Sequence, residues 1–380
     1  MDSYIDKIRA DSPTLNELTF LNHASTGPLH GRTLNAMKEY LDFWKKFDFT
    51  EAKNKKEESR SLFAKLINAK KEEVTFTSDV TQGTNIALNV MNYDKNSNIV
   101  CYWNDYVSQV YSALYLQQTK GVEYRAVKDR NGSILPEDFA EKVDKNTKIV
   151  LISHVQWLNG FKANVKEISK IALENGAKIV VDTIQSTGVV ENDVRDWDVD
   201  FLTCGVAKWL LGPNQTGFFF MKEELIDEYY PPFAGYQGTD YGNIEAPYWD
   251  VNKLDFLPTI DKFSISNTGN MMYHVACAGM KIIDDYGIEK VEKRILELTD
   301  YLIERLSEIP EKTFLTPLKR DFRSGIINVK LNNSIELAQK LSKQKIIVSS
   351  RYGGLRISPH FYNTLEDIDI LVKNMDLLLN

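Results

Sequence analysis

Cysteine is scarce in this chain of 380 residues, which contains only Cys101, Cys204 and Cys277. Three is an odd number for a set of disulfides, and these residues are too widely separated to form a zinc knuckle. We therefore predict a cytoplasmic protein with reduced thiols and no metal site.

Long apolar runs and a dominant charge are also absent. No run approaches the ~20 residues of a membrane-spanning helix, and the amino terminus lacks the apolar core of a signal peptide. The net charge is −7, from 46 basic and 53 acidic residues mixed along the chain. We therefore expect neither nucleic acid nor a membrane surface as a partner.

Short strand-like runs alternate with helical patterns through the middle of the chain, which indicates βαβ units and a largely parallel sheet. We predict an α/β fold, with a large domain over residues 15–262 and a smaller C-terminal α+β domain over 263–380. The N-terminal helix, residues 1–14, should pack on the small domain, and 269–307 should form a long helical section. The seven strand-like runs are 73–77, 99–102, 122–127, 149–153, 179–182, 201–204 and 218–221.

One lysine, Lys208, stands between the apolar stretches 199–202 and 209–211. Burial in such surroundings disfavours the ammonium form, so we expect a lowered pKa and an accessible neutral amine. Such an amine can form a Schiff base with a carbonyl compound. An ordinary lysine whose stem crosses apolar surface is the alternative interpretation.

An acidic residue, Asp182, ends the β-branched run 178–181. Open α/β sheets bind ligands at the carboxyl ends of their strands. Lysine and acid together meet the needs of pyridoxal phosphate, because the lysine holds the aldehyde and the carboxylate keeps the pyridine nitrogen protonated.

Two linked motifs, Val180-Val-Asp-Thr-Ile-Gln-Ser-Thr-Gly188 and Lys208-Trp-Leu-Leu-Gly-Pro213, closely resemble those of the class V aminotransferase family. That family consists of fold-type I pyridoxal-phosphate enzymes and includes cysteine desulfurases, kynureninase and isopenicillin N epimerase-like proteins. The resemblance covers roughly residue 20 to the C-terminus. It implies a pyridoxal 5'-phosphate cofactor, a mainly parallel seven-stranded sheet, and catalytic roles for Lys208 and Asp182.

The resemblance also implies the remaining cofactor contacts. Val80, through its amide, and Thr81 begin a helix after a strand and align with the turn that holds the phosphate. Tyr106 should stack on the pyridine ring, and Gln185 should bond the phenolate oxygen. Thr268 resembles the residue by which a neighbouring subunit reaches the phosphate, which implies a homodimer with active sites at the subunit interface.

Arg356 lies in a segment that resembles the family's substrate-carboxylate motif. Its planar guanidinium suits bidentate binding of a carboxylate, although a surface ion pair is the alternative. His154 is as consistent with a structural role as with a catalytic one. The further candidates for substrate binding are Asn22, His23, Trp157 and Asn159.

We predict a pyridoxal-phosphate enzyme acting on a small α-amino acid, most readily an aminotransferase. A lyase or an epimerase would use the same residues and is the alternative. A persulfide-forming desulfurase is disfavoured because 344–354 contains no cysteine, and 205–207 reads Gly-Val-Ala where desulfurases carry Ser-x-His.

The sequence gives less support to other functional classes. The glycine spacing of 212–217 is that of a P-loop, but Phe218 and Phe219 occupy the positions that require Lys and Ser/Thr. No Gly-x-Gly-x-x-Gly follows an early strand, which disfavours a nicotinamide dehydrogenase. A non-catalytic binding protein on the same fold remains an alternative, although the lysine, the acid and the arginine are all present.

Overall fold

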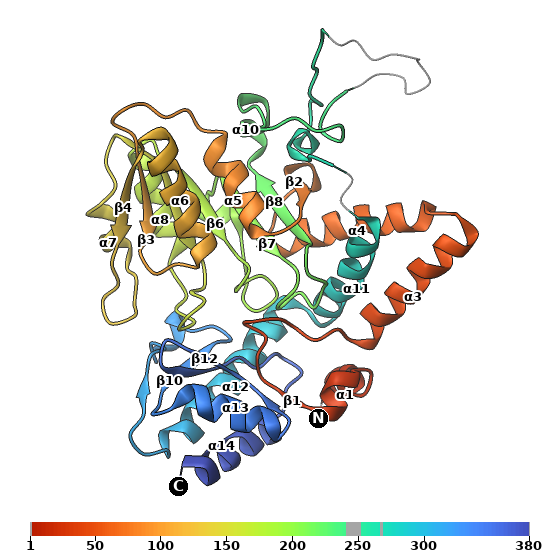
Figure 1. Cartoon of the computed structure of the whole chain (residues 1–380), viewed down its shortest axis with the longest axis vertical. Coiled ribbons are helices and arrows are strands. Elements are labelled where there is room, and N and C mark those ends of the chain that lie inside the picture. The colour runs from red at the N-terminus through yellow and green to blue at the C-terminus, as the bar shows by residue number, and fades with distance from the viewer. Residues whose placement is uncertain (1, 241–251, 267–268, 380) are drawn as a thin grey trace.

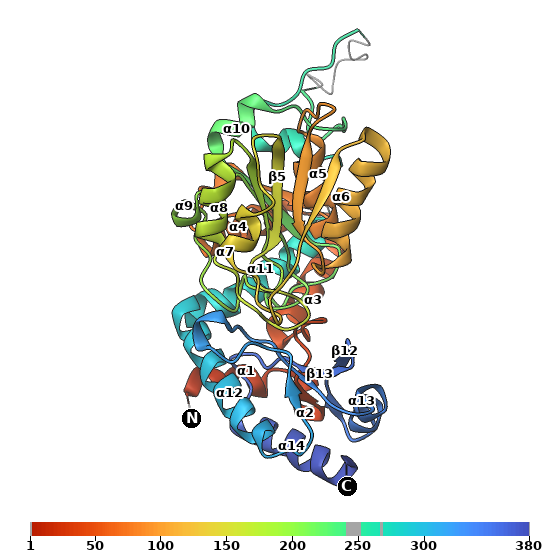
Figure 2. The ribbon, with the colours of Figure 1, turned by 90° about the vertical axis from the view of Figure 1, so that its left-hand side faces the viewer.

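The computed structural model describes residues 2–240, 252–266 and 269–379. Figures 1 and 2 show a larger part built around a sheet and a smaller part, at the bottom, that contains the C-terminal helices and strands. The N-terminal helix α1 (Ser3–Ala10) lies beside the smaller part. None of the described helices is long and apolar enough to cross a membrane.

A seven-stranded sheet with the order β2-β8-β7-β6-β5-β3-β4 forms the centre of the larger part. Strand β8 is antiparallel to both its neighbours, and every other pair in this sheet is parallel. The predicted α/β fold with a mainly parallel sheet is therefore confirmed. The strands are β2 (Val74–Thr77), β3 (Asn98–Tyr102), β4 (Glu123–Val127), β5 (Thr147–Ser153), β6 (Lys178–Asp182), β7 (Phe201–Gly205) and β8 (Gly217–Met221).

Helices cover both faces of this sheet, which explains why its central strands are apolar throughout. Successive side chains of a strand point to opposite faces, so Phe219 packs in a cluster with α5 and α6, whereas Phe218 and Phe220 pack with α4, α8 and α11. Phe63 of α4 stacks on Phe218 with ring centroids 4.5 Å apart. The helices are α4 (Thr50–Leu66), α5 (Val80–Asn89), α6 (Val107–Lys120), α8 (Val165–Glu174) and α11 (Asn270–Tyr286).

The carboxyl ends of the parallel strands meet at one edge of the sheet, which faces the smaller part (Figure 1). Asp182 pairs in register with Ser153 on one side and with Thr203 on the other. Strands β3 and β5 are neighbours, and the chain proceeds from them in opposite directions across the sheet. Ligands of open α/β sheets bind at such a switch point.

The smaller part contains a four-stranded antiparallel sheet with the order β12-β13-β10-β9. Strand β1 (Thr19–Phe20) pairs with β11 (Ile346–Ile347), so backbone hydrogen bonds tie the N-terminal segment to this part. The division at residue 262 stays a prediction. The strands are β9 (Thr313–Phe314), β10 (Ile327–Lys330), β12 (Ser349–Arg351) and β13 (Gly354–Ile357).

The long helical section expected over 269–307 consists of two helices. Gly287, with φ of 91°, separates α11 from α12 (Ile288–Ser307). A positive φ is accessible to glycine and interrupts the helix. The other helices are α2 (Pro13–Glu17), α3 (Gly31–Lys46), α7 (Pro136–Ala140), α9 (Val194–Trp197), α10 (Glu223–Glu228), α13 (Ser334–Lys343), α14 (Leu365–Leu379), and the 3₁₀ turns Lys71–Glu73, Ile260–Phe263 and Arg320–Phe322.

Candidate active site

Lys208 and Asp182 come together at the carboxyl edge of the sheet. Asp182 is the last residue of β6, and Lys208 follows β7, the neighbouring strand. Burial lowers the pKa of Lys208 and raises the pKa of Asp182, while the attraction between the two charges opposes both shifts. The lysine is thus held closer to its neutral, nucleophilic form than a lysine in water.

Two donors fix the carboxylate of Asp182. Gln109 Nε2 donates to Oδ2 at 2.9 Å and the Ile184 backbone N–H donates to Oδ1 at 2.8 Å. Thr84 Oγ1 in turn donates to Gln109 Oε1 at 3.0 Å. Gln109 was not among the residues predicted from the sequence, although its place in the first turn of the helix that follows Tyr106 was an available signal.

A second buried carboxylate, Asp105, orders the loop after β3. It accepts hydrogen bonds from the Ser153 N–H at 2.9 Å, from Ser153 Oγ at 2.6 Å and from the Tyr106 N–H at 2.7 Å. Burial raises the pKa of Asp105, and its negative charge also raises the pKa of Asp182. Asp105 therefore joins the ends of β3 and β5 beside the site.

Tyr106 places an aromatic ring over the lysine. Lys208 Nζ lies 5.6 Å from the centroid of this ring, and Tyr106 is 44% exposed. The Trp157 ring meets it edge to face with centroids 5.7 Å apart. The ring thus has open surface on which a planar group could stack, although the stacking role stays a prediction.

The N-terminal segment packs closely against the loop that carries Lys208 and is hydrogen-bonded to it. The Gly27 N–H donates to Ala207 O at 2.9 Å, and a Cβ on Gly27 would lie 2.2 Å from Lys208 O. Gln185 bridges the same two segments, since it donates to Ala24 O at 2.9 Å and accepts from Trp209 Nε1 at 2.8 Å. Its proposed contact with a phenolate oxygen stays a prediction.

The phosphate candidates lie at the start of α5. Val80 and Thr81 are its first two residues, whose N–H groups have no acceptor within the helix. Asp79 caps the helix by accepting from the Gln82 N–H at 2.8 Å. These residues thus lie at a helix N-terminus that already carries one carboxylate, and their role in binding phosphate stays a prediction.

Arg356 lies on β13 at the mouth of the site. Its Nη1 donates to Trp157 O at 2.6 Å and its Nη2 to Ser25 Oγ at 2.7 Å, whereas its buried Nε has no partner. Burial, assisted by the positive charge of Arg351, lowers the pKa of Arg356 to about 9. A buried guanidinium with an unused donor is a ready anion site.

Asn159 and His154 form hydrogen bonds with other parts of the protein. Asn159 bonds Gly132 O and the Phe161 N–H. The ring of His154 bonds Asn192 Oδ1 at 3.0 Å, in a position that favours the structural interpretation.

His23 is fully buried, and both of its ring nitrogens have partners, Ser358 O and Tyr362 Oη. Its ring packs on Trp209 and His360, in an aromatic cluster formed by His23, Trp209, His360 and Tyr362. No ring nitrogen is left for a substrate.

Asn22 reaches the site indirectly, because its Oδ1 accepts from Ser25 Oγ at 2.9 Å. Thr268 lies outside the described residues. Its predicted contribution to a neighbouring subunit's site is therefore not placed by the structure.

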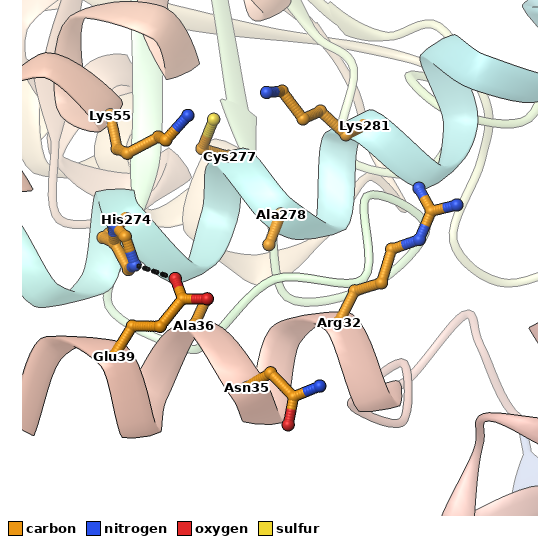
Figure 3. Close-up of a pocket in the computed structure, with 9 residues that line it drawn as sticks. All are labelled: Arg32, Asn35, Ala36, Glu39, Lys55, His274, Cys277, Ala278 and Lys281. Carbon is orange, nitrogen blue, oxygen red and sulfur yellow. Dashed lines mark hydrogen bonds and ion pairs between the residues drawn. The ribbon is translucent and has the colours of Figure 1, made fainter. Parts of the chain in front are cut away.

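None of the three cysteines is exposed. Cys277 of α11 lines a pocket between α3, α4 and α11, beside Lys55 and Lys281 (Figure 3). Despite these cations, burial raises the pKa of its thiol to about 12. Burial also raises the pKa of Cys204 to about 12, so neither is a ready nucleophile.

Comparison with known proteins defines the class. Residues 19–371 match the family Aminotransferase class-V. The chain therefore belongs to this family, whose members are pyridoxal-phosphate enzymes.

Individual relatives differ in the reaction for which they are named. A probable cysteine desulfurase of Pyrococcus abyssi is 28% identical, with 98% of this chain and 97% of the relative covered. An uncharacterized aminotransferase of Bacillus subtilis is 24% identical, with 97% and 96% covered. A solved mutant of C-DES with glycine covalently linked to its PLP cofactor superimposes with a TM-score of 0.88, at 18% identity over 97% and 98% of the two chains.

The residues present fit pyridoxal phosphate. Lys208 offers an amine of lowered pKa for the aldehyde, and Asp182 offers a fixed, buried carboxylate for the pyridine nitrogen. Tyr106 offers a ring face and α5 offers free N–H groups. This donor set matches the aldehyde, ring nitrogen, ring plane and phosphate of the cofactor.

Proposed function

We propose that the protein is a pyridoxal 5'-phosphate-dependent aminotransferase of a small α-amino acid. The observation that carries the proposal is the convergence of Lys208, Asp182 and Arg356, two basic residues and one acid from separate segments, at one edge of the sheet. When bound, the cofactor supplies an electron sink for the bond broken at Cα of the amino acid.

The residues of the chain would each perform one of the remaining roles. Lys208 would hold the cofactor covalently and, once released, its neutral amine would take the proton from Cα as general base. Asp182, kept in place by Gln109 and the Ile184 N–H, would hold the ring nitrogen in its protonated form. Arg356 would bind the substrate carboxylate through its guanidinium, whose Nη2 donates to Ser25 Oγ and whose Nε has no partner.

The fate of that proton would decide between transamination and epimerisation, and loss of a β-substituent from the substrate would make the reaction a lyase. Lyase and epimerase chemistry would use the same three residues, so both stay alternatives. The buried cysteines and the cysteine-free segment 344–354 argue against persulfide formation. A non-catalytic binding protein on the same fold is the alternative from another class.

Product analysis with single amino acids separates these reactions. We expect turnover that depends on an added keto acid. Ammonia without an acceptor would indicate a lyase, and the opposite enantiomer an epimerase. A cofactor absorption band with no product from any amino acid would support the binding protein.

Lys208→Ala tests the site itself. We expect the variant to retain some cofactor but to lose turnover by several orders of magnitude, because the covalent anchor and the base vanish together. Wild-type protein should show a yellow band that survives desalting and disappears on borohydride reduction. Near-normal activity in the variant would overturn the assignment.

The proposal includes a cytoplasmic homodimer. The exposed aromatic side chains of Trp44 and Phe47, at the corner between α3 and α4, support an interface. Sedimentation analysis checks the oligomeric state.

A further inference from the structure

Two arginines converge at the mouth of the site. Arg351 ends β12, Arg356 lies on β13, and these strands are antiparallel neighbours. Both guanidinium groups reach the same hydroxyl: the distance to Ser25 Oγ is 2.7 Å from Arg356 Nη2 and 3.5 Å from Arg351 Nη2. Both positive charges also lower the pKa of Lys208.

Neither arginine has an acidic partner in the described part of the chain. Every other arginine of the sequence forms an ion pair with an aspartate or glutamate there. Arg351 also has one donor on a backbone carbonyl, Ser350 O at 2.7 Å. The chain thus pairs its arginines everywhere except at this site.

Two neighbouring cations without counter-charges repel each other, and the positive charge of Arg351 contributes to the lowered pKa of Arg356. The carboxylate of an amino acid neutralises only one of them. Arg356 is the more buried and reaches the Trp157 carbonyl, so it suits the carboxylate that every substrate shares. Arg351, at the partly exposed strand end, remains free for a second anion.

We propose that the substrate is an α-amino acid whose side chain ends in an anionic group, with its α-carboxylate on Arg356 and its side-chain anion on Arg351. This inference rests on the proposed function. It makes Arg351 a specificity-determining residue, because a guanidinium binds a carboxylate or sulfinate through two parallel N–H donors. An uncharged side chain would leave Arg351 unpaired.

Titration of the cofactor absorption band tests this preference in the loaded protein. The anionic probes are L-aspartate, L-glutamate and L-cysteine sulfinate, and the uncharged ones are L-asparagine, L-glutamine and L-alanine. We expect half-saturation by the best anionic probe at a concentration about 100-fold below that of its uncharged counterpart. Comparison among the three anionic probes identifies the favoured group and length.

Two variants locate the preference. Arg351→Gln should reduce this ratio to near one, and Arg351→Lys should retain part of it because the charge remains. The matched control is Arg130→Gln, which removes an arginine paired with Asp138 on the surface and should leave the ratio unchanged. A wild-type ratio near one, or an equal loss for both groups of probes in Arg351→Gln, would mean that both arginines serve a single carboxylate and would overturn the inference.

A readout without turnover separates this inference from the proposed function. Cofactor-free protein is melted with succinate or butyrate at matched ionic strength, and we expect succinate alone to raise the Tm, an effect lost in Arg351→Gln. If no amino acid changes the absorption band, the proposed function fails while this comparison still decides on the arginine pair. Equal stabilisation by the two acids would refute the pair as a site for two anions.

Discussion

Substitution of Arg356 should separate substrate binding from stability. The pKa of this guanidinium falls from 12.5 to about 9, mainly because it is buried. At about 1.4 kcal/mol per pKa unit, burial of the charge opposes folding by roughly 5 kcal/mol. A cation whose pKa is lower in the folded state loses stability at every pH below that value, and the loss fades as the pH rises from about 9 toward 12.5.

Two charge-assisted hydrogen bonds, to Trp157 O and Ser25 Oγ, offset this loss by about 1.5–3 kcal/mol each. Arg356→Gln should therefore change the free energy of unfolding by less than about 2 kcal/mol, which corresponds to a Tm shift within about 5 °C. Substrate binding should weaken by about 2–5 kcal/mol, or roughly 30-fold to several thousand-fold in KM, because the carboxylate loses its counter-charge.

Calorimetry and steady-state kinetics on the same preparation measure both quantities. A structural arginine would behave in the opposite way, with a large fall in Tm and an unchanged KM. That result would refute the assignment of Arg356 to the substrate carboxylate. The cofactor absorption band should persist in the variant, because Lys208 is untouched.

The remaining predictions concern the lysine and the acid. Gly27→Ala should lower both Tm and cofactor content, because its Cβ would collide with Lys208 O at 2.2 Å; calorimetry and absorbance check this. Gln109→Leu should lower the free energy of unfolding by about 1–3 kcal/mol. It should also weaken cofactor retention on dialysis, because Asp182 loses a hydrogen-bond donor. The control Gln117→Leu on the same helix, which loses only a bond from the Tyr124 N–H, should not affect retention. The rate of cofactor uptake by the cofactor-free protein should rise with pH, with a midpoint well below the ordinary lysine value of 10.5, because burial lowers the pKa of Lys208; stopped-flow absorbance gives the midpoint.

Local sequence pattern predicted the fold well, for physical reasons. The strands of the main sheet are short, apolar and separated by helical patterns, so each could be recognised by itself. The break at Gly287 within the helical section 269–307 could not be predicted, because one glycine inside a strongly helical pattern does not reveal its φ.

Site residues could be predicted only where their role depends on the residues next to them in the sequence. Asp182 ends a strand and Lys208 follows one, so the sequence alone indicates where they lie. Gln109 could not be assigned in this way, because its bond to Asp182 joins residues 73 positions apart. Conversely, His23 and Asn159 lie in sequence motifs that suggested substrate binding. Their side chains are instead hydrogen-bonded to other groups of the protein.

The aromatic cluster of His23, Trp209, His360 and Tyr362 has a consequence for biosynthesis. Its members come from the beginning, the middle and the end of the chain, and Trp209 directly follows the lysine of the site. A nascent polypeptide can complete its main sheet before the segment that contains His360 and Tyr362 has been synthesised. We therefore expect the loop that carries Lys208 to become ordered for cofactor binding only after that later segment has joined the cluster.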